Sequence, residues 1–182
     1  ECYARAFYRT YGYPTVVIRP FNTYGPRSHY EGDSGEVIPK MILRAMAGKP
    51  LIIFGDGEQT RDFTYVSDIA SGIIMTGMND AAVGETVNIG SGKEITINQL
   101  AEKIKDVVNS QGVEISHIEQ RPGDTLRLYA DISKAENLTS FVPEVGLDEG
   151  LARLAKWFRN REESPEEMLK REYAKNWLKV KD

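Results

Sequence analysis

Cysteine and histidine are scarce in this chain of 182 residues. The single cysteine, Cys2, excludes an intrachain disulfide, and a reducing compartment such as the cytoplasm is the natural expectation. With Cys2, His29 and His117 as the only soft ligands, a structural zinc site is not expected, and we predict no metal site. Small domains stabilised by disulfides or by zinc are therefore poor models for this protein.

Long apolar runs and an excess of positive charge are also lacking. No stretch is long enough to span a bilayer, and no basic start followed by an apolar run resembles a signal peptide. The net charge of −4 and the pI near 5.4 argue against an extended electrostatic contact with nucleic acid or an anionic membrane. The 41% of hydrophobic and 27% of charged residues are typical of a soluble globular protein.

The chain has no methionine at its start, and its first segment has the pattern of half a helix. The aromatic residues Tyr3, Phe7 and Tyr11 share one helical face, and Gly12 is a natural helix stop. From this opening we expect the sequence to be a piece of a longer protein.

The stretch from Val16 to Arg27, VVIRPFNTYGPR, joins a buried-type strand to a polar turn. Its β-branched run predicts the strand, and the Asn, Gly and Pro that follow predict a loop. Open α/β sheets bind their ligands where strands end in such loops. From these residues alone, an ordinary exit from a strand is an equally good interpretation.

Strand and helix patterns alternate along the rest of the chain. Strands are predicted at 16–19, 51–54, 63–66, 86–89 and 113–118. Helices are predicted over 37–46, from Ser67 or Asp68 to 78, from Thr96 or Asn98 to 108, and over 133–141, 147–158 and 165–179. The second of these helices is expected to turn Ile69, Ile73, Ile74 and Met78 inward, and the last has Met168, Leu169, Tyr173, Trp177 and Leu178 as its apolar side. This alternation indicates an α/β fold.

Two later stretches place an arginine beside a glycine-containing turn. In the first, GDGEQTRDF, Arg61 follows a double-glycine turn, and in the second, RPGD, Arg121 stands three residues before Asp124. Two arginines that converge would neutralise a diphosphate, and an aspartate could accept hydrogen bonds from sugar hydroxyls. The alternative is that each arginine pairs with its neighbouring aspartate on the surface.

Taken in order, five motifs resemble one family. They are RPFNTYGPR, GEVIPKMI, LIIFGDGEQTRDFTYVSDIA, NIGSG and RPGDTLRLYADISKA. The series resembles the C-terminal part of the extended short-chain dehydrogenase/reductases that modify nucleotide-diphosphate sugars, and the resemblance covers Glu1 to Phe158. It implies an α/β fold that is the C-terminal part of a doubly wound Rossmann-type sheet plus a small mixed α/β substrate-binding subdomain. We therefore expect a substrate-binding portion over 1–160 and a helical tail over 161–182.

The resemblance implies roles for four polar residues. Asn22 resembles the asparagine that hydrogen-bonds the phosphate of the sugar nucleotide, and Arg61 resembles the arginine that pairs with the diphosphate. Arg121 resembles a second arginine on phosphate, and Asp124 the aspartate that holds the ribose. These roles agree with the chemistry expected from the residue types.

The apolar residues of the same motifs resemble the walls of the site. Val37, Ile52 and Phe54 resemble residues that receive the pyrimidine base. Pro20 and Phe21 stand where members of the family touch the nicotinamide end of the cofactor, NAD. An apolar wall suits both flat rings.

Two parts of the family pattern are missing from the sequence. The sequence contains no Gly-rich dinucleotide fingerprint. It also contains no Tyr-x-x-x-Lys pair, because none of Tyr3, Tyr8, Tyr11 and Tyr24 has a lysine four positions on. We therefore name no catalytic residue and expect the chain to be inactive alone, with NAD bound chiefly by the complete parent protein.

The expected ligand is a UDP- or dTDP-hexose, and the expected activity of the parent is most like that of a UDP-glucose 4-epimerase. The dTDP-glucose 4,6-dehydratases and UDP-glucuronate decarboxylases are alternatives, since they share these motifs. A non-catalytic module that binds a nucleotide sugar or only dimerises is another, and a general interaction domain a third. Because strand edges of the parent sheet would be bare, we expect a homodimer or other self-association.

Overall fold

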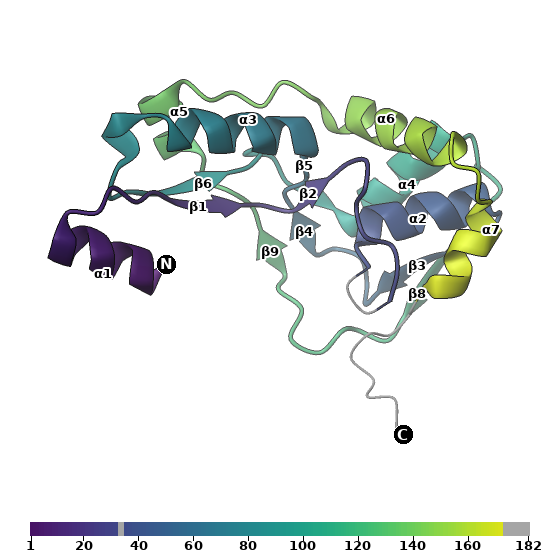
Figure 1. Ribbon diagram of the computed structural model, residues 1–182. Helices are drawn as coiled ribbons and strands as arrows, with labels where there is room; N and C mark the ends of the chain where they lie inside the picture. Colours follow the sequence, from purple (N-terminus) through teal and green to yellow (C-terminus); the bar gives the residue numbers. More distant parts are fainter. Residues whose placement is uncertain (33–34, 173–182) are drawn as a thin grey trace. The chain divides into compact units, whose positions relative to one another are not determined.

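The computed structural model describes residues 1–32 and 35–172 (Figure 1). Over these residues the chain is a mixed α/β structure whose longer strands pair in parallel. It divides into two compact units, each assembled from three separate stretches of sequence. Unit 1 consists of Glu1–Thr23, Thr60–Ile95 and Arg127–Leu147, and unit 2 of Tyr24–Gln59, Thr96–Leu126 and the chain from Asp148 on.

Unit 1 is built on two parallel strands, β1 (Val17–Pro20) and β6 (Thr86–Ile89). The helices α3 (Val66–Gly77) and α5 (Ser133–Thr139) pack on this pair and on each other, and lie on the same side of it in Figure 1. The strand predicted at 86–89 is confirmed. The other elements of the unit are α1 (Cys2–Tyr11), β4 (Thr60–Arg61), β5 (Thr64–Tyr65), a 3₁₀ helix over Asp80–Ala82 and β9 (Arg127–Leu128).

The core of unit 1 lies between its parallel strands and the two helices. Val87, Ile89 and Phe141 are almost fully buried in one apolar cluster. A Cβ atom at Gly72 of α3 would lie 2.6 Å from Cγ2 of Ile89 and 3.0 Å from the ring of Phe141. Only glycine therefore allows α3 to approach the strands this closely.

The apolar face predicted for α3 is partly wrong. Ile69 is buried, but Ile74 and Met78 are 60% and 83% exposed, and Ile73 is also exposed. The helix turns the face that carries Ile69 and Gly72 to the core instead, because the close approach at Gly72 fixes its rotation. Apolar side chains that a pattern assigns to the core thus lie on the surface of unit 1.

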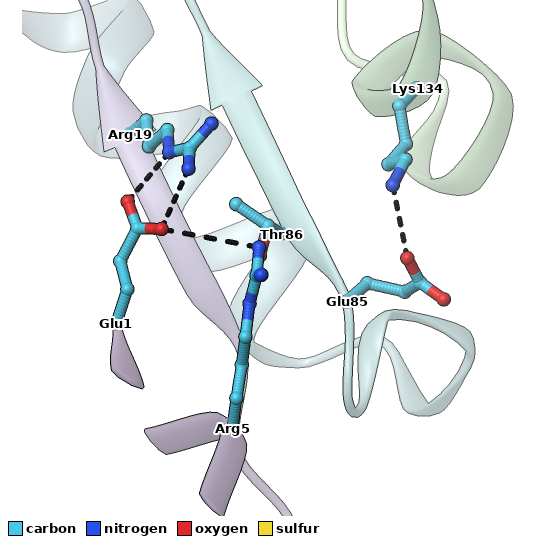
Figure 2. A network of polar contacts seen from close by, with 6 residues as sticks. All are labelled: Glu1, Arg5, Arg19, Glu85, Thr86 and Lys134. Atoms are coloured by element: carbon cyan, nitrogen blue, oxygen red, sulfur yellow. Dashed lines mark hydrogen bonds and ion pairs between the residues drawn. The ribbon is translucent and has the colours of Figure 1, made fainter. Parts of the chain in front are cut away.

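Helix α1 has no buried residue, and polar contacts join it to β1 and β6 (Figure 2). Arg19 donates hydrogen bonds of 2.6 Å to both carboxylate oxygens of Glu1 and thereby lowers the pKa of that carboxyl. Arg5 donates to Oγ1 of Thr86 at 2.7 Å. Because these groups are exposed, such contacts contribute little to stability. The helix ends as predicted at Gly12, which has a positive φ of 64°.

Unit 2 is built on a second parallel pair, β3 (Leu51–Phe54) and β8 (Ile115–Ile118). The helices α2 (Val37–Met46) and α4 (Ile97–Val108) pack on β3 and on each other. The predicted spans of α2 and β3 are confirmed. The other elements are α6 (Leu147–Arg159), α7 (Pro165–Met168) and a 3₁₀ helix over Leu169–Arg171, while β2 (Thr23–Tyr24) and β7 (Ile95–Thr96) run across the division between the units.

Helix starts follow the predicted caps in unit 2 but not in α3. Thr96 caps α4 in a capping box with Gln99, which decides between the two predicted starts. Helix α3, in contrast, begins at Val66, so the predicted cap at Ser67 or Asp68 is wrong. The Asp68 carboxylate is buried and accepts a hydrogen bond of 2.9 Å from the backbone N–H of Val145 instead.

The predicted tail helix is shorter than expected. Ser164 accepts a hydrogen bond of 3.2 Å from the backbone N–H of Glu167, and Pro165 begins the helix as predicted. The α-helix ends at Met168, the 3₁₀ turn ends at Arg171, and Glu172 is extended. The predicted apolar side at Tyr173, Trp177 and Leu178 lies outside the described residues.

Candidate functional site

The carboxyl end of β1 brings Asn22 to the stretch that carries Arg61. Strand β1 ends at Pro20, and the backbone N–H of Phe21 donates to the carbonyl of Ile89 at 2.8 Å. One residue on, Nδ2 of Asn22 donates to the carbonyl of Asp62 at 2.9 Å. In unit 1, a hydrogen bond therefore joins Asn22 to the backbone of the residue that follows Arg61.

Arg61 is held by its own strand. It lies in β4, which pairs in parallel with β9 so that Arg61 stands opposite Leu128. Arg61 is half-buried, and its Nη1 donates to the carbonyl of Thr60 at 2.7 Å. The following residue, Asp62, is fully buried. Arg61 is the last residue of β4, so the buried carboxylate of Asp62 belongs to the residue that directly follows the strand.

Unit 2 gathers the second arginine and its turn. The Arg121 guanidinium lies 5.7 Å from the centre of the Phe54 ring, in a cation–π contact. The backbone N–H of Asp124 donates to the Arg121 carbonyl at 3.2 Å, so that RPGD forms the predicted turn, with Gly123 at a φ of 72°. Gln59, which is 9% exposed, donates to the Phe54 carbonyl at 2.9 Å and reaches Oδ2 of Asp124 at 3.5 Å. Phe54, Arg121 and Asp124 thus belong to one cluster.

The remaining apolar residues lie on two elements of unit 2. Ile52 and Phe54 are half-buried, whereas Leu51 and Ile53 between and beside them are fully buried. This alternation places Ile52 and Phe54 on the same face of β3. Val37 is the first residue of α2 and is half-buried. The predicted base-binding role of these residues stays a prediction.

Two residues of this region have structural roles that the sequence analysis missed. Gln59 links Phe54 to Asp124, and Asp62 accepts hydrogen bonds from several segments of unit 1. Both belong to the motif GDGEQTRDF, in which the sequence analysis gave a role only to Arg61. No local signal distinguishes Asp62, because its neighbours in the sequence, Arg61 and Thr64 among them, are themselves charged or polar.

The described residues give two further findings on chemistry. Over residues 1–32 and 35–172, no three histidine, cysteine, aspartate or glutamate side chains are gathered as a metal site requires. In the same part of the chain, every helix is too short or too polar to cross a membrane. The clusters present hydrogen-bond donors, a carboxylate and aromatic or aliphatic side chains.

A third polar group in unit 1 predicts a pH dependence of stability. In this group, Nε of Arg127 in β9 donates to both carboxylate oxygens of Glu94, at 3.0 and 2.9 Å, and Nη2 donates to Oε1 at 2.6 Å. Oγ1 of Thr60 donates to Oε2 of the same carboxylate at 2.7 Å. These contacts, that of Arg127 above all, lower the pKa of the Glu94 carboxyl from 4.5 to about 2.

We expect this carboxylate to stabilise the fold above pH 4.5 and the effect to disappear as the pH falls towards about 2, because protonation breaks the contacts. Urea unfolding measured across this window should show the loss in the wild type. Glu94→Gln and Arg127→Gln should each remove that part of the pH dependence. Identical pH profiles for wild type and both variants would contradict the assignment.

The class of protein is defined by comparison with known structures and sequences. Residues 1–90 match the model of the NAD dependent epimerase/dehydratase family. The solved UDP-glucose 4-epimerase of Thermotoga maritima with UDP-glucose is 32% identical, with a TM-score of 0.82 over 87% of this chain and 50% of that one. The parallel strands and covering helices are thus those of a Rossmann-type α/β fold.

Curated relatives indicate the same class of protein. A putative UDP-glucose 4-epimerase of Methanocaldococcus jannaschii is 40% identical over 160 residues, which are 88% of this chain and 50% of the relative. UDP-glucuronic acid decarboxylase 1 of Xenopus tropicalis is 40% identical over 158 residues, 87% of this chain and 36% of the relative. The chain belongs to the NAD-dependent epimerase/dehydratase family. It spans half or less of the length of these two relatives.

Proposed function

We propose that this chain is the substrate-binding portion of an NAD-dependent nucleotide-sugar epimerase or dehydratase, most like a UDP-glucose 4-epimerase. The observation that carries the proposal is the hydrogen bond from Asn22 to the Asp62 carbonyl, which joins the end of β1 to the residue after Arg61. An amide and a guanidinium at the carboxyl end of a parallel strand are suitable donors for a diphosphate.

The cluster in unit 2, taken by itself, presents groups that suit a nucleotide. Arg121 supplies further positive charge, Asp124 supplies an acceptor for ribose hydroxyls, and Phe54 supplies an aromatic wall. With Val37 and Ile52, these residues fit a nucleoside diphosphate whose base is a pyrimidine. UDP and dTDP share all of these features, and a single methyl group of the base separates them.

Pro20 and Phe21 fit the nicotinamide end of NAD. They present apolar surface directly at the carboxyl end of β1, where Pro20 is exposed and Phe21 half-buried. In this family the chemistry that NAD supplies is oxidation at the sugar C4, and the branches differ in what happens to the ketone that results. We assign this chain a role in binding and orienting the substrate, and we expect it to be inactive without the rest of the parent.

The branch of the family stays open between three activities. The relatives include a putative UDP-glucose 4-epimerase and a UDP-glucuronic acid decarboxylase at equal identity, and the motifs also occur in dTDP-glucose 4,6-dehydratases. The 4-epimerase remains our first choice because both the curated relatives and the solved structures include UDP-glucose 4-epimerases, one of them with UDP-glucose. Self-association through strand edges, a cytoplasmic location and the division at residue 160 stay predictions.

The test is calorimetric binding of UDP-glucose and dTDP-glucose to the 182-residue chain. Arg61→Ala should weaken binding of the preferred ligand by about 1.5–3 kcal/mol, because it removes a charge-assisted hydrogen bond. Arg153→Ala is the matched control, since that guanidinium pairs with Glu149 on the surface of α6, and it should leave the affinity unchanged.

Two outcomes would count against the proposal in different ways. If Arg61→Ala binds as tightly as the wild type, Arg61 does not belong to the site. If neither nucleotide sugar binds to the wild-type chain, the substrate-binding function itself is wrong.

A further inference from the structure

The Asp62 carboxylate is a buried hydrogen-bond acceptor that joins separate segments of unit 1. It is 0% exposed. Its Oδ1 accepts from the backbone N–H of Ser91 at 2.9 Å, from Oγ of Ser91 at 2.6 Å and from Oγ1 of Thr64 at 3.2 Å. Its Oδ2 accepts from the backbone N–H groups of Gly92 at 2.9 Å and Ala130 at 3.1 Å. The side chain therefore ties the turn after β6 and the strand end near Ala130 to the end of β4.

This arrangement requires a carboxylate. Each of the two oxygens accepts at least one backbone N–H, and a backbone donor cannot turn into an acceptor. An amide of the same shape has only one oxygen, so in either orientation its NH₂ group would face a backbone N–H of Ser91, Gly92 or Ala130. A donor that faces a donor in a buried place loses its hydrogen bond and is destabilising.

The main chain of Asp62 belongs to the same framework. Its N–H donates to the carbonyl of Leu128 at 3.0 Å, and its carbonyl accepts from Nδ2 of Asn22 at 2.9 Å. The preceding residue is Arg61, the last residue of β4, whose Nη1 donates to the carbonyl of Thr60 at 2.7 Å. The backbone of Asp62 thus contacts the Asn22 amide directly and is bonded to Arg61.

We propose that Asp62 is a positioning residue for Asn22 and Arg61, the two residues proposed to bind the diphosphate. Its buried carboxylate holds in place the backbone that accepts the hydrogen bond of Asn22 and that directly follows Arg61, without touching the ligand itself. This inference rests on the proposed function of Asn22 and Arg61. It predicts that a substitution at Asp62 weakens the binding of a nucleoside diphosphate but not the binding of the nucleoside alone.

Asp68 provides a matched comparison within the same unit. It is also a buried aspartate, 6% exposed, and its carboxylate accepts from the backbone N–H of Val145 at 2.9 Å. Its hydrogen bonds are with Val145 and Ser67 and thus not with Asn22 or with the peptide after Arg61. Asp68→Asn therefore reports the general cost of changing a buried carboxylate in unit 1.

The experiment measures the affinity of the 182-residue chain for UDP and for uridine, or for dTDP and thymidine if the wild type prefers them. Asp62→Asn should weaken diphosphate binding about tenfold and change nucleoside binding less than about twofold, because only the phosphates meet Asn22 and Arg61. In an Arg61→Ala background the same change should cost clearly less, since the two residues act together. Asp68→Asn should change neither affinity.

A milder variant covers the case in which Asp62→Asn does not fold. Ser91→Ala removes one of the five hydrogen bonds to the carboxylate and leaves the backbone donors in place. It should weaken diphosphate binding about threefold, with nucleoside binding unchanged. Equal losses for nucleotide and nucleoside, or losses that add fully to that of Arg61→Ala, would overturn the inference.

A measurement without ligand separates this inference from the proposed function. Nitrogen-15 relaxation of the Arg61 Nε–H group should show greater mobility in Ser91→Ala than in the wild type or in Asp68→Asn. If the Arg61 signal is unchanged, Asp62 does not position Arg61, whatever the chain binds. If the signal changes as expected and no nucleotide binds, the positioning role stands and the proposed function fails.

Discussion

Replacing Phe141 by alanine is expected to lower the free energy of unfolding by about 3–5 kcal/mol, because the change removes a large aromatic ring from a packed core. Phe141 is 1% exposed and belongs to the cluster of Val87 and Ile89 between the parallel strands and the two helices of unit 1. Gly72 leaves no side chain that could fill the space. Urea denaturation followed by circular dichroism measures the loss.

The neighbouring residue provides the control. Val142 is 66% exposed, so Val142→Ala should change the free energy of unfolding by less than about 0.5 kcal/mol. A loss below about 1 kcal/mol for Phe141→Ala would mean that the ring is not in a packed core.

A comparable loss is expected in unit 2 when Arg44 is replaced by alanine. Its guanidinium meets the Glu172 carboxylate through Nε at 3.0 Å and Nη2 at 2.9 Å, and it also donates to the Pro50 carbonyl at 3.1 Å. The two charged side chains are only 15% and 9% exposed. Removing one partner leaves a charge without compensation, which costs about 3–5 kcal/mol in a buried pair.

Two comparisons test this assignment. Lys170 and Glu167 form an exposed pair in the same tail, so Lys170→Ala should cost less than about 0.5 kcal/mol. The double variant Arg44→Leu with Glu172→Leu should recover much of the stability, because it leaves no charge behind. If Arg44→Ala lowers the free energy of unfolding no more than Lys170→Ala does, the ion pair of Arg44 and Glu172 does not hold the tail to α2.

Elements with one buried face could be predicted from the sequence. The spans of α2, β3 and β6 agree with the prediction, since each sequence shows the period of its own secondary structure. The errors arise where packing partners decide. The rotation of α3 depends on the contact of Gly72 with Ile89, and Asp68, a predicted cap, accepts instead from the backbone N–H of Val145, 77 positions away in the sequence.

The sequence allows candidate site residues to be named, but it does not predict how they are arranged. Arg61, Arg121 and Asp124 could be named because an arginine beside a turn has a recognisable pattern. The hydrogen bond of Asn22 to Asp62 joins residues 40 positions apart, and Asp62 reaches Ala130 across 68 positions. Contacts over such separations depend on the folded topology, so a local pattern contains no information about them.

The interleaving of the two units in the sequence has a consequence for synthesis on the ribosome. The parallel pair of β1 and β6 is complete after Ile89, but the core of unit 1 lacks Phe141 until the last of its three segments has been made. Unit 2 obtains the partner of Arg44 only with Glu172. During synthesis both units therefore lack long-range contacts at the same time. The apolar strands of the growing chain stay exposed to chaperones until late in translation.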